Sequence, residues 1–416
     1  MSTDLSVGVD VTSVGRIAKL SARRPGFVGK LFTAEEAAYC RDRPERLAAR
    51  WAAKEAVRKV FGSTGRPIPT YSSIAVLHRP GGAPEVTVAG SVVPGLEISL
   101  SHDAGLAIAV AVLTGSMEPL TVEQLPLQIV LPDRADSSNK GTFGTALVLA
   151  GSPGLPGAAV LACMGALRGG AGKVKAVVGR SSGVDLFPPE VIRLLVSGTV
   201  TGYGREAAQE IAEELGSASA VVCGPGLGQE GPVPGFVAAV LEQMADRGER
   251  LVVDADGLNV ISQSQQLRGG VPPGCVMTPH PLEAARLLSI EVGAVQADRV
   301  GTARALARQF GAVIVLKGAG SVVADHSGEV WIDAHATSAL AAGGTGDVLS
   351  GLIGALLSQG STPLQAARAG VFMHGEAGTR LARRRGRAGI LASEVAEALV
   401  EVQESVRRLL EARLQR

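Results

Sequence analysis

A glycine-rich loop carries the residues of this sequence whose types and spacing could do chemistry. Gly343, Gly344 and Gly346 fall within four residues, and an apolar helical pattern begins immediately after them. Such a loop must feed a helix N-terminus, where unpaired backbone N–H groups and the positive end of the helix dipole form an anion site. The pattern therefore predicts that this loop binds phosphate.

Asp347 follows this loop at the first turn of the helix. A carboxylate beside a phosphate site repels the ligand unless it has a chemical task, and a general base toward a hydroxyl that meets the phosphate is one such task. The alternative is that Asp347 only caps the helix N-terminus. The loop by itself leaves both interpretations open.

A second pair of carboxylates lies in the first part of the chain. Asp10 ends an apolar strand expected over 5–9, and Glu55 lies on a helix expected over 44–61, with Lys59 one turn further on the same face. Magnesium needs only one or two protein carboxylates when phosphates and waters complete its octahedron, so Asp10 and Glu55 could hold it. The alternative is a solvated helix residue and a strand cap.

The elements around Asp10 and Glu55 predict an α+β unit over 1–115. Helices are expected to open at Val14 and at Thr33, where Glu36 completes a capping box. Further strands are expected over 74–77, 85–88 and 106–113. A stretch rich in proline, serine and charge, 116–138, is interpreted as a linker and entry segment to a second domain over 139–416.

Strands and helices alternate in the second domain, which indicates an α/β fold with a mostly parallel central sheet covered on both faces. The expected strands are 146–150, 173–178, 220–222, 251–253, 276–277 and 313–316. Polar and glycine-rich segments follow these strands at 224–228, 254–259, 278–283 and 317–321. Ligands of open α/β sheets bind beyond the carboxyl ends of the strands, which is where these segments fall.

Composition excludes several classes of function. The 40 Lys and Arg residues balance 39 Asp and Glu residues, so no basic surface for nucleic acid is indicated. The uncharged run 141–167 is broken by glycines and prolines, so it is interpreted as strand, loop and helix rather than a membrane span. No signal segment precedes the first strand, and four dispersed cysteines are expected to be buried thiols, so we expect a cytoplasmic protein with no membrane association. The C-terminal segment 401–416 is expected to be a charged, solvated helix.

The first unit resembles holo-acyl-carrier-protein synthase. The matching pieces are Gly8 to Val11, Arg16 and Ile17, Phe32 to Glu36, Arg50 to Ala56, Lys59, Phe61 and Gly62, and Ser99 to His102. The resemblance implies transfer of phosphopantetheine from coenzyme A to a serine of acyl carrier protein. It also implies Mg²⁺ bound by Asp10 and Glu55, catalytic Lys59 near the phosphates, and a trimer. Trp51 and the segment 62–66 depart from the family pattern, and His102 is either a substrate contact or a structural histidine.

The second unit resembles the ADP-dependent NAD(P)H-hydrate dehydratases of the ribokinase-like superfamily. The matching pieces are Asn139 to Gly144, Ala150 to Ser152 with Pro156 to Ala158, Gly224 to Leu227, Asp254 to Asp256, Pro279 to Glu283, Leu316 to Gly318, and Leu340 to Asp347. The implied reaction uses the terminal phosphoryl group of ADP, or of ATP, to activate the hydroxyl of hydrated nicotinamide, after which phosphate leaves and NAD(P)H is restored.

The same resemblance implies roles for individual residues. Asp347 would be the catalytic base, and Ala158, Gly226, His280 and Asp347 would border the hydrated dinucleotide. The expected nucleotide-binding residues are Lys317, Gly318, Ala319, Gly320, Ser321, Gly343, Gly344, Thr345 and Gly346. Asp254, Asp256 or both could position water-bound Mg²⁺, and the alternative for His280 is a histidine that only caps its loop. Thr337 and Leu282 depart from the family, which commonly has Asn and Gly at these positions.

Three hypotheses follow from the sequence. The first is a fused enzyme with both activities, consuming coenzyme A in one unit and repairing a damaged cofactor in the other. The second is that the larger unit is a kinase of a vitamin precursor, because glycine loops of this kind also serve ordinary phosphoryl transfer. The third is that the first unit is a non-catalytic oligomerisation module.

Overall fold

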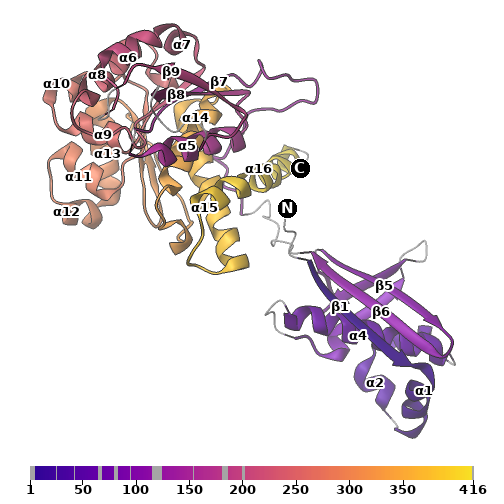
Figure 1. The fold of residues 1–416 in the computed structure, drawn as a ribbon. Coiled ribbons are helices and arrows are strands. Elements are labelled where there is room, and N and C mark those ends of the chain that lie inside the picture. The colour runs from indigo at the N-terminus through magenta and orange to yellow at the C-terminus, as the bar shows by residue number, and fades with distance from the viewer. Residues whose placement is uncertain are drawn as a thin grey trace. The chain divides into compact units, whose positions relative to one another are not determined.

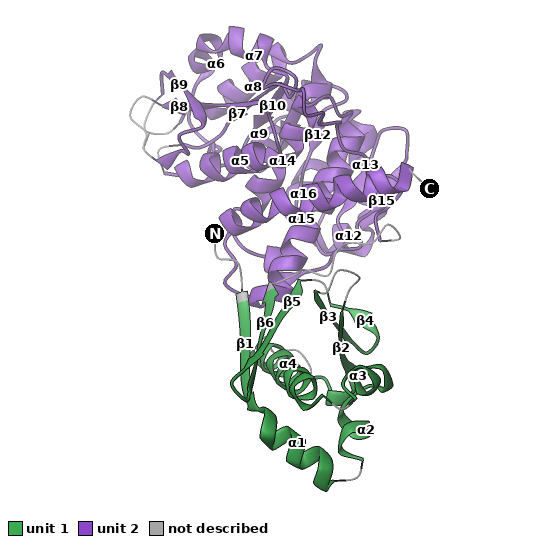
Figure 2. Ribbon diagram, turned by 90° about the vertical axis from the view of Figure 1, so that its right-hand side faces the viewer, with its two compact units in different colours: residues 1–119 green, residues 120–416 purple. Residues whose placement is uncertain are grey.

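A computed structural model describes residues 5–24, 26–41, 43–63, 68–78, 83–93, 95–114, 124–152, 154–179, 186–198 and 202–414. Contacts divide the chain into two compact units, residues 1–119 and 120–416 (Figures 1 and 2). Part of the expected linker, 116–123, lies outside the described residues. The two units are described separately.

Unit 1 has the expected α+β fold, with helices packed on antiparallel sheets. One sheet has the order β1 (Leu5–Ser13), β6 (Leu106–Thr114), β5 (Leu96–Asp103), and the other has the order β2 (Ile74–His78), β3 (Pro84–Val88), β4 (Ser91–Val92). The helical elements are α1 (Val14–Arg23), α2 (Phe27–Leu31), α3 (Ala34–Tyr39), α4 (Pro44–Ser63) and η1 (Tyr71–Ser73). Figure 2 shows α4 lying against the strands β1, β5 and β6.

Strand β1 is longer than the sequence indicated. It pairs with β6 along its whole length, from Leu5 opposite Thr114 to Ser13 opposite Leu106, so the expectation that it ends at Asp10 is wrong. The polar residues after Asp10 hid this, because an edge strand alternates polar and apolar residues. A Cβ added to Gly8 would lie 2.1 Å from the carbonyl oxygen of Ala56, so β1 crosses α4 in close contact at this glycine.

A buried ion pair joins α3 to α4. The Thr33–Glu36 capping box is confirmed, and the Glu36 carboxylate also accepts a hydrogen bond from Lys54 Nζ at 2.8 Å. Both side chains are 0% exposed. Lys54 further donates to the carbonyl oxygens of Tyr71 and Ile74, so its ammonium ties two helices to the start of β2.

Replacement of Lys54 by Met is expected to destabilise unit 1 by about 3–5 kcal/mol, because Glu36 is then a buried carboxylate without a cation beside it. The measurement is urea unfolding followed by tryptophan fluorescence of Trp51. The exposed Lys19→Met serves as the control and should change the free energy of unfolding by less than about 0.5 kcal/mol. Equal stability of the two variants would contradict the role given to the Lys54–Glu36 pair.

Unit 2 is built on a nine-stranded sheet in the order β15-β14-β13-β12-β11-β10-β7-β8-β9. In this order, every two neighbouring strands from β13 through β7 to β9 pair in parallel. Strands β14 and β15 add an antiparallel edge next to β13. The strands are β7 (Thr145–Leu149), β8 (Lys173–Gly179), β9 (Val191–Val196), β10 (Ala220–Cys223), β11 (Leu251–Val253), β12 (Val276–Met277), β13 (Val313–Leu316), β14 (Val322–Ala324) and β15 (Val330–Ile332). The six expected strands and the mostly parallel sheet are confirmed, whereas β9, β14 and β15 were missed.

Helices cover both faces of this sheet (Figure 1). One face carries α5 (Pro156–Arg168), α14 (Thr345–Ser358), α15 (Pro363–Arg385) and α16 (Ala392–Leu414). On the other face and its margins lie α6 (Arg205–Glu210), α7 (Ala212–Ser217), α8 (Val233–Gln243), α9 (Asp256–Ser262), α10 (Gln265–Gly269), α11 (Pro281–Leu288), α12 (Val292–Ala297) and α13 (Arg299–Phe310). Short 3-10 turns are η3 (Gly248–Arg250) and η4 (Ser338–Leu340).

Glycines fix α14 at the centre of the first of these faces. A Cβ at Gly351 would lie 1.9 Å from the carbonyl oxygen of Ala162 in α5, and a Cβ at Gly165 would lie 2.2 Å from the carbonyl oxygen of Val348. The two helices therefore touch backbone to backbone, and no larger residue fits at either glycine. This contact fixes the position of the helix that follows the Gly343–Gly346 loop.

Three further sequence interpretations can be compared with the structure. The uncharged run 141–167 is strand β7, a loop and helix α5, as expected. The C-terminal helix α16 exists but is not solvated all round, because Val402 and Val406 lie in the core; its frequent charges masked this apolar stripe. All four cysteines are free and buried. No helix within the described part of the chain is both long and apolar enough to cross a membrane.

Candidate active site

The glycine loop leads into α14 as the sequence predicted. Helix α14 begins at Thr345, and Gly344 is its N-cap residue with φ of 89°, a left-handed conformation that suits glycine. No side chain caps this end of the helix. Asp347 therefore lies in the first turn without capping it, and the capping interpretation of this residue is not what the structure shows.

Asp347 has the electrostatic properties of a base. Burial, reinforced by the nearby carboxylate of Asp254, raises its pKa to about 7, although Lys317 acts in the opposite direction. A carboxylate with a pKa near neutrality is half deprotonated in the cell and still basic enough to accept a proton. The perturbed pKa is what a general base at this position requires.

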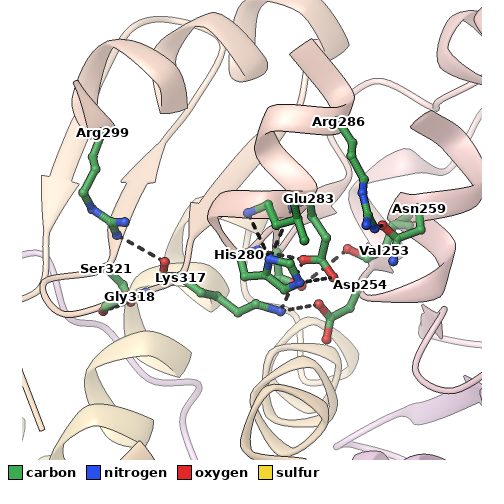
Figure 3. Close-up of polar contacts among 12 residues, drawn as sticks. Val253, Asp254, Asn259, His280, Glu283, Arg286, Arg299, Lys317, Gly318 and Ser321 are labelled. Atoms are coloured by element: carbon green, nitrogen blue, oxygen red, sulfur yellow. Dashed lines mark hydrogen bonds and ion pairs between the residues drawn. The ribbon is translucent and has the colours of Figure 1, made fainter. Parts of the chain in front are cut away.

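Lys317 directly follows the last residue of β13, and its side chain reaches the first turn of α14. Its ammonium lies 2.6 Å from Asp254 Oδ1 and 4.0 Å from Glu283 Oε2 (Figure 3). Burial opposes the charge, but these two carboxylates outweigh it and hold the pKa of Lys317 above its usual value. A Cβ added to Gly346 would lie 3.4 Å from Lys317 Nζ, so the cation is adjacent to the glycine loop.

Asp254 and Asp256 follow β11 but have different partners. Ala255 between them has φ of 47°, which turns the chain sharply into α9. Asp256 accepts hydrogen bonds from the Gly228 backbone at 2.9 Å and from Gln229 Nε2 at 2.8 Å, so it fixes the loop after β10. Asp254 is fully buried, and its Oδ2 has no hydrogen-bond partner.

Besides Asp347 on α14, the residues expected to border the dinucleotide are Ala158, Gly226 and His280, which come from three further segments. Ala158 on α5 and Gly226 in the loop after β10 are neighbours, because a Cβ at Gly226 would lie 2.7 Å from the Cβ of Ala158. His280 caps α11: its Nδ1 accepts hydrogen bonds from the backbone N–H groups of Leu282 and Glu283. The capping alternative for His280 is therefore realised, and its Nε2 lies 3.2 Å from Glu283 Oε1.

Glu283 belongs to the segment Pro279–Glu283 that resembles the dehydratases, but the sequence indicated no role for it. Its carboxylate accepts a hydrogen bond from the His280 backbone at 2.7 Å and lies next to Lys317. Burial raises its pKa to about 7. The signal was available, because Glu three residues after an N-cap completes a capping box.

A cavity of about 200 Å³ opens beside the glycine loop. Its wall comprises Lys317, Gly318, Ala319, Ser321, Asp333, His335, Thr337, Leu340, Ala341, Thr345, Gly346, Leu349, Val371, His374 and Gly375. Six of the nine expected nucleotide-binding residues are in this wall, whereas Gly320, Gly343 and Gly344 belong to the same two turns outside it. Val371, His374 and Gly375 of α15 line a side of the cavity for which the sequence indicated no residues.

One part of that wall is a buried ionic network. His335 Nδ1 lies 2.9 Å from Asp333 Oδ1, and His335 Nε2 lies 3.2 Å from Glu376 Oε2. Burial opposes the imidazolium, but the two carboxylates raise the pKa of His335 to about 9. Arg380 donates to Glu376 at 2.6 Å. These residues were missed, because 41 positions separate His335 from Glu376 and the two share no motif.

The two candidate metal-binding carboxylates of unit 1, Asp10 and Glu55, each have a hydrogen-bond partner. Lys59 Nζ donates to Asp10 Oδ1 at 2.8 Å and to the carbonyl oxygen of Val9 at 2.7 Å. Glu55 Oε1 accepts a hydrogen bond from the Tyr71 hydroxyl at 2.6 Å. Burial, with the Glu55 carboxylate, raises the pKa of Tyr71, so the phenol remains a donor.

The departures in unit 1 have partial structural explanations. Trp51 stacks on Tyr71 with ring centroids 5.1 Å apart and on Phe27 at 5.8 Å, so the larger ring fills the space between α2 and η1. Of the segment 62–66, residues 64–66 lie outside the described residues. His102 is exposed on β5. No cluster of three or more His, Cys, Asp or Glu side chains suited to a metal occurs among the described residues.

Comparison with known proteins assigns the two units. The family model for NAD(P)H-hydrate dehydratase matches residues 146–401, more than half of the chain. The chain belongs to the NAD(P)H-hydrate dehydratase family. Residues 6–111 match the model for the 4′-phosphopantetheinyl transferase superfamily. The prediction of two fused enzyme units is thus confirmed at the level of families.

Individual relatives agree with this assignment. The chain is 40% identical over 276 residues to the ADP-dependent (S)-NAD(P)H-hydrate dehydratase of Neisseria meningitidis, covering 65% of this chain and 88% of that protein. It is 38% identical to the bifunctional NAD(P)H-hydrate repair enzyme of Moorella thermoacetica, and spans about half (51%) of that relative's length. A crystal structure of the Bacillus subtilis ADP/ATP-dependent NAD(P)H-hydrate dehydratase with ATP/Mg²⁺ superposes with a TM-score of 0.57 at 30% identity, covering 70% of this chain and 99% of that one.

The two departures of the dehydratase unit are placed by the structure. Thr337 is the N-cap of η4, and its Oγ1 accepts a hydrogen bond from the Ala339 backbone at 3.3 Å. A threonine can thus cap this turn where the family commonly has Asn. Leu282 is in the first turn of α11 and is exposed, so it is not required for the core.

Proposed function

We propose that the chain is a bifunctional enzyme whose larger unit dehydrates (S)-NAD(P)H-hydrate to NAD(P)H at the expense of ADP. The observation that carries the proposal is the position of Asp347 in the first turn of α14, directly after the glycine loop. Its carboxyl group has a pKa of about 7, and no side chain caps this end of the helix. Lys317 lies beside that loop. A base, an anion site and a cation in one place suit phosphoryl transfer to a hydroxyl.

The proposed reaction has two stages. Asp347 accepts the proton of the hydrate hydroxyl while the hydroxyl oxygen attacks the terminal phosphorus of ADP. AMP then leaves, and a phosphate ester of the hydrate forms. The loop 343–346 and Lys317 stabilise the charge on the transferred group. The ring nitrogen then expels phosphate while the adjacent ring carbon loses a proton, which restores the carbon–carbon double bond of the reduced nicotinamide.

Mg²⁺ fits the charge distribution of this site. Asp254 Oδ2 is a buried carboxylate oxygen without a hydrogen-bond partner, and a hard cation or its bound water is the ligand such an atom suits. When bound, Mg²⁺ would neutralise charge on the phosphates of the nucleotide. Asp256 is less suitable, because both of its oxygens hold the loop at Gly228 and Gln229.

For unit 1 we propose transfer of phosphopantetheine from coenzyme A to a serine of acyl carrier protein. Asp10 on β1 and Glu55 on α4 come from elements that cross at Gly8, and each keeps a second carboxylate oxygen beyond its partner Lys59 or Tyr71. This donor set fits Mg²⁺ shared with a pyrophosphate. Lys59 is half exposed, which leaves its ammonium accessible to phosphate.

A homo-oligomer, specifically a trimer through unit 1, is part of the proposal. Apolar side chains are exposed on the paired strands β1 and β6: Val7, Val9, Val11, Leu106 and Ile108. A contiguous apolar sheet face of this kind is typical of a surface that another copy covers.

Incubation of the purified protein with NADH-hydrate and ADP, or ATP, tests the dehydratase proposal. Absorbance of reduced nicotinamide should recover only when nucleotide is present, with release of one phosphate per NADH formed. A stable phosphorylated product without NADH recovery would instead identify the larger unit as a small-molecule kinase.

Asp10→Ala is expected to reduce phosphopantetheine transfer by at least about 10²-fold, because the variant loses a ligand for the cation that neutralises the pyrophosphate. The measurement is mass spectrometry of apo acyl carrier protein after incubation with coenzyme A and Mg²⁺. Glu97→Ala, which removes an exposed carboxylate from β5, is the control and should transfer normally. No transfer by the wild type would reduce unit 1 to an oligomerisation module.

A further inference from the structure

His374 is a buried histidine of the cavity wall to which neither the sequence nor the proposed reaction gives a role. It lies in the middle of α15 and is 7% exposed. Its Nε2 is buried and has no hydrogen-bond partner. Buried polar atoms are nearly always paired, so an unpaired nitrogen in the wall of a cavity indicates a hydrogen bond that a bound molecule would complete.

The hydrogen-bond partner of the other ring nitrogen, Nδ1, determines whether Nε2 is a donor or an acceptor. The backbone of Thr345 makes a hydrogen bond to the ring that favours its protonation, so the Thr345 carbonyl accepts from the ring. Because Nε2 has no partner, that contact belongs to Nδ1, which therefore carries the hydrogen. Burial, assisted by Lys317, lowers the pKa of His374 to about 4, so the ring is neutral and Nε2 is a pure acceptor at physiological pH.

His374 lies between two chemically different parts of the cavity wall. Lys317, Thr345 and Gly346 form the polar part at the start of α14, where phosphates are expected. The apolar part is formed by Leu340, Leu349 and Val371, the last one turn before His374 on α15. A nucleotide whose phosphates lie at the polar part would place its sugar and base toward His374 and the apolar side chains.

Phosphate cannot satisfy Nε2, because ionised phosphate oxygens are acceptors only. The nucleoside part of ADP does carry donors, namely the ribose hydroxyls and the amino group of adenine. His335, the other histidine of the wall, cannot substitute for His374, because both of its nitrogens are occupied by Asp333 and Glu376.

We propose that His374 Nε2 accepts a hydrogen bond from the nucleoside part of the adenine nucleotide and so determines which nucleotides the site takes. This inference rests on the proposed use of the cavity by ADP. It adds a specificity-determining residue on α15 to the nucleotide-binding residues expected in the turns 317–321 and 343–346.

Calorimetric dissociation constants test the proposal without requiring the reaction. ADP, 2′-deoxy-ADP, 3′-deoxy-ADP and inosine diphosphate, which lacks the amino donor, are titrated into the full chain. The wild type should bind one of the three analogues about 10-fold more weakly than ADP, the size expected for one lost hydrogen bond. The analogue affected identifies the donor as a ribose hydroxyl or the adenine amino group.

Two substitutions show whether His374 is responsible. His374→Leu removes the acceptor, so ADP and that analogue should bind with equal affinity. His374→Gln places an amide oxygen near the position of Nε2 and should keep part of the discrimination, which also covers the case that the Leu variant does not fold. His326→Leu, at an exposed histidine outside the cavity, is the control and should discriminate as the wild type does.

The outcomes separate this inference from the proposed function. Discrimination that persists in His374→Leu, or is absent from a wild type that binds ADP, overturns the role of His374 and leaves the dehydratase proposal standing. A wild type that binds none of the four nucleotides overturns both.

Discussion

Asp347→Asn is expected to lower kcat for NADH recovery by about 10²–10⁴-fold, the contribution typical of a general base. Asparagine has the size of aspartate but cannot accept the hydroxyl proton. The glycine loop and Lys317 are unchanged, so KM for ADP should change little. The measurement is the rate of absorbance recovery from NADH-hydrate at saturating ADP.

The control for Asp347→Asn is Asp246→Asn, at an exposed aspartate of the same unit, which should be fully active. The wild-type kcat should also depend on pH, because only the deprotonated Asp347 accepts a proton. With a pKa of about 7, the rate should fall as the pH is lowered through 7 and level off above about 8. An Asp347→Asn variant with wild-type kcat would exclude the base assigned here.

Lys317→Met is expected to have the next largest effect, on stability and on activity together. Asp254, which is fully buried, would lose the partner 2.6 Å away. Breaking one side of a buried ion pair costs about 3–5 kcal/mol of unfolding free energy. Urea unfolding of the full chain measures this loss, with the exposed Lys173→Met as the matched control.

The pH dependence of Lys317→Met gives a second, independent readout. Lys317 lowers the pKa of Asp347, so its removal raises that pKa further above the ordinary value for aspartate. Residual activity in the folded variant should therefore appear at a higher pH than in the wild type. An unshifted pH profile in a folded, active Lys317→Met would mean that the ammonium does not act on the base.

Local patterns in the sequence predicted the positions of single site residues well. The glycine loop before α14, the capping box at Thr33 and the strand ends that carry Asp254, His280 and Lys317 all follow from spacing and residue type. Strand ends in parallel sheets converge on one edge, so the approximate location of the site also followed.

Other residues of the site have no local pattern. His335 meets Glu376 across 41 positions, and His374 meets Thr345 across the contact of α15 with α14. Strands β14 and β15 were missed for a related reason. Each has only three residues, so their short apolar runs could not be told from loop segments.

The sequence by itself determined the two enzyme families, the parallel sheet, the glycine loop and the candidate base, because these depend on local conformational preference and on motifs of neighbouring residues. Only the tertiary structure decided the protonation properties of the site. The pKa of Asp347 depends on burial and on Asp254 and Lys317, which are far away in the chain. The unpaired Nε2 of His374 likewise exists only where α15 closes the cavity. Burial and through-space charge are properties of packing, and no spacing of residues along the chain specifies them.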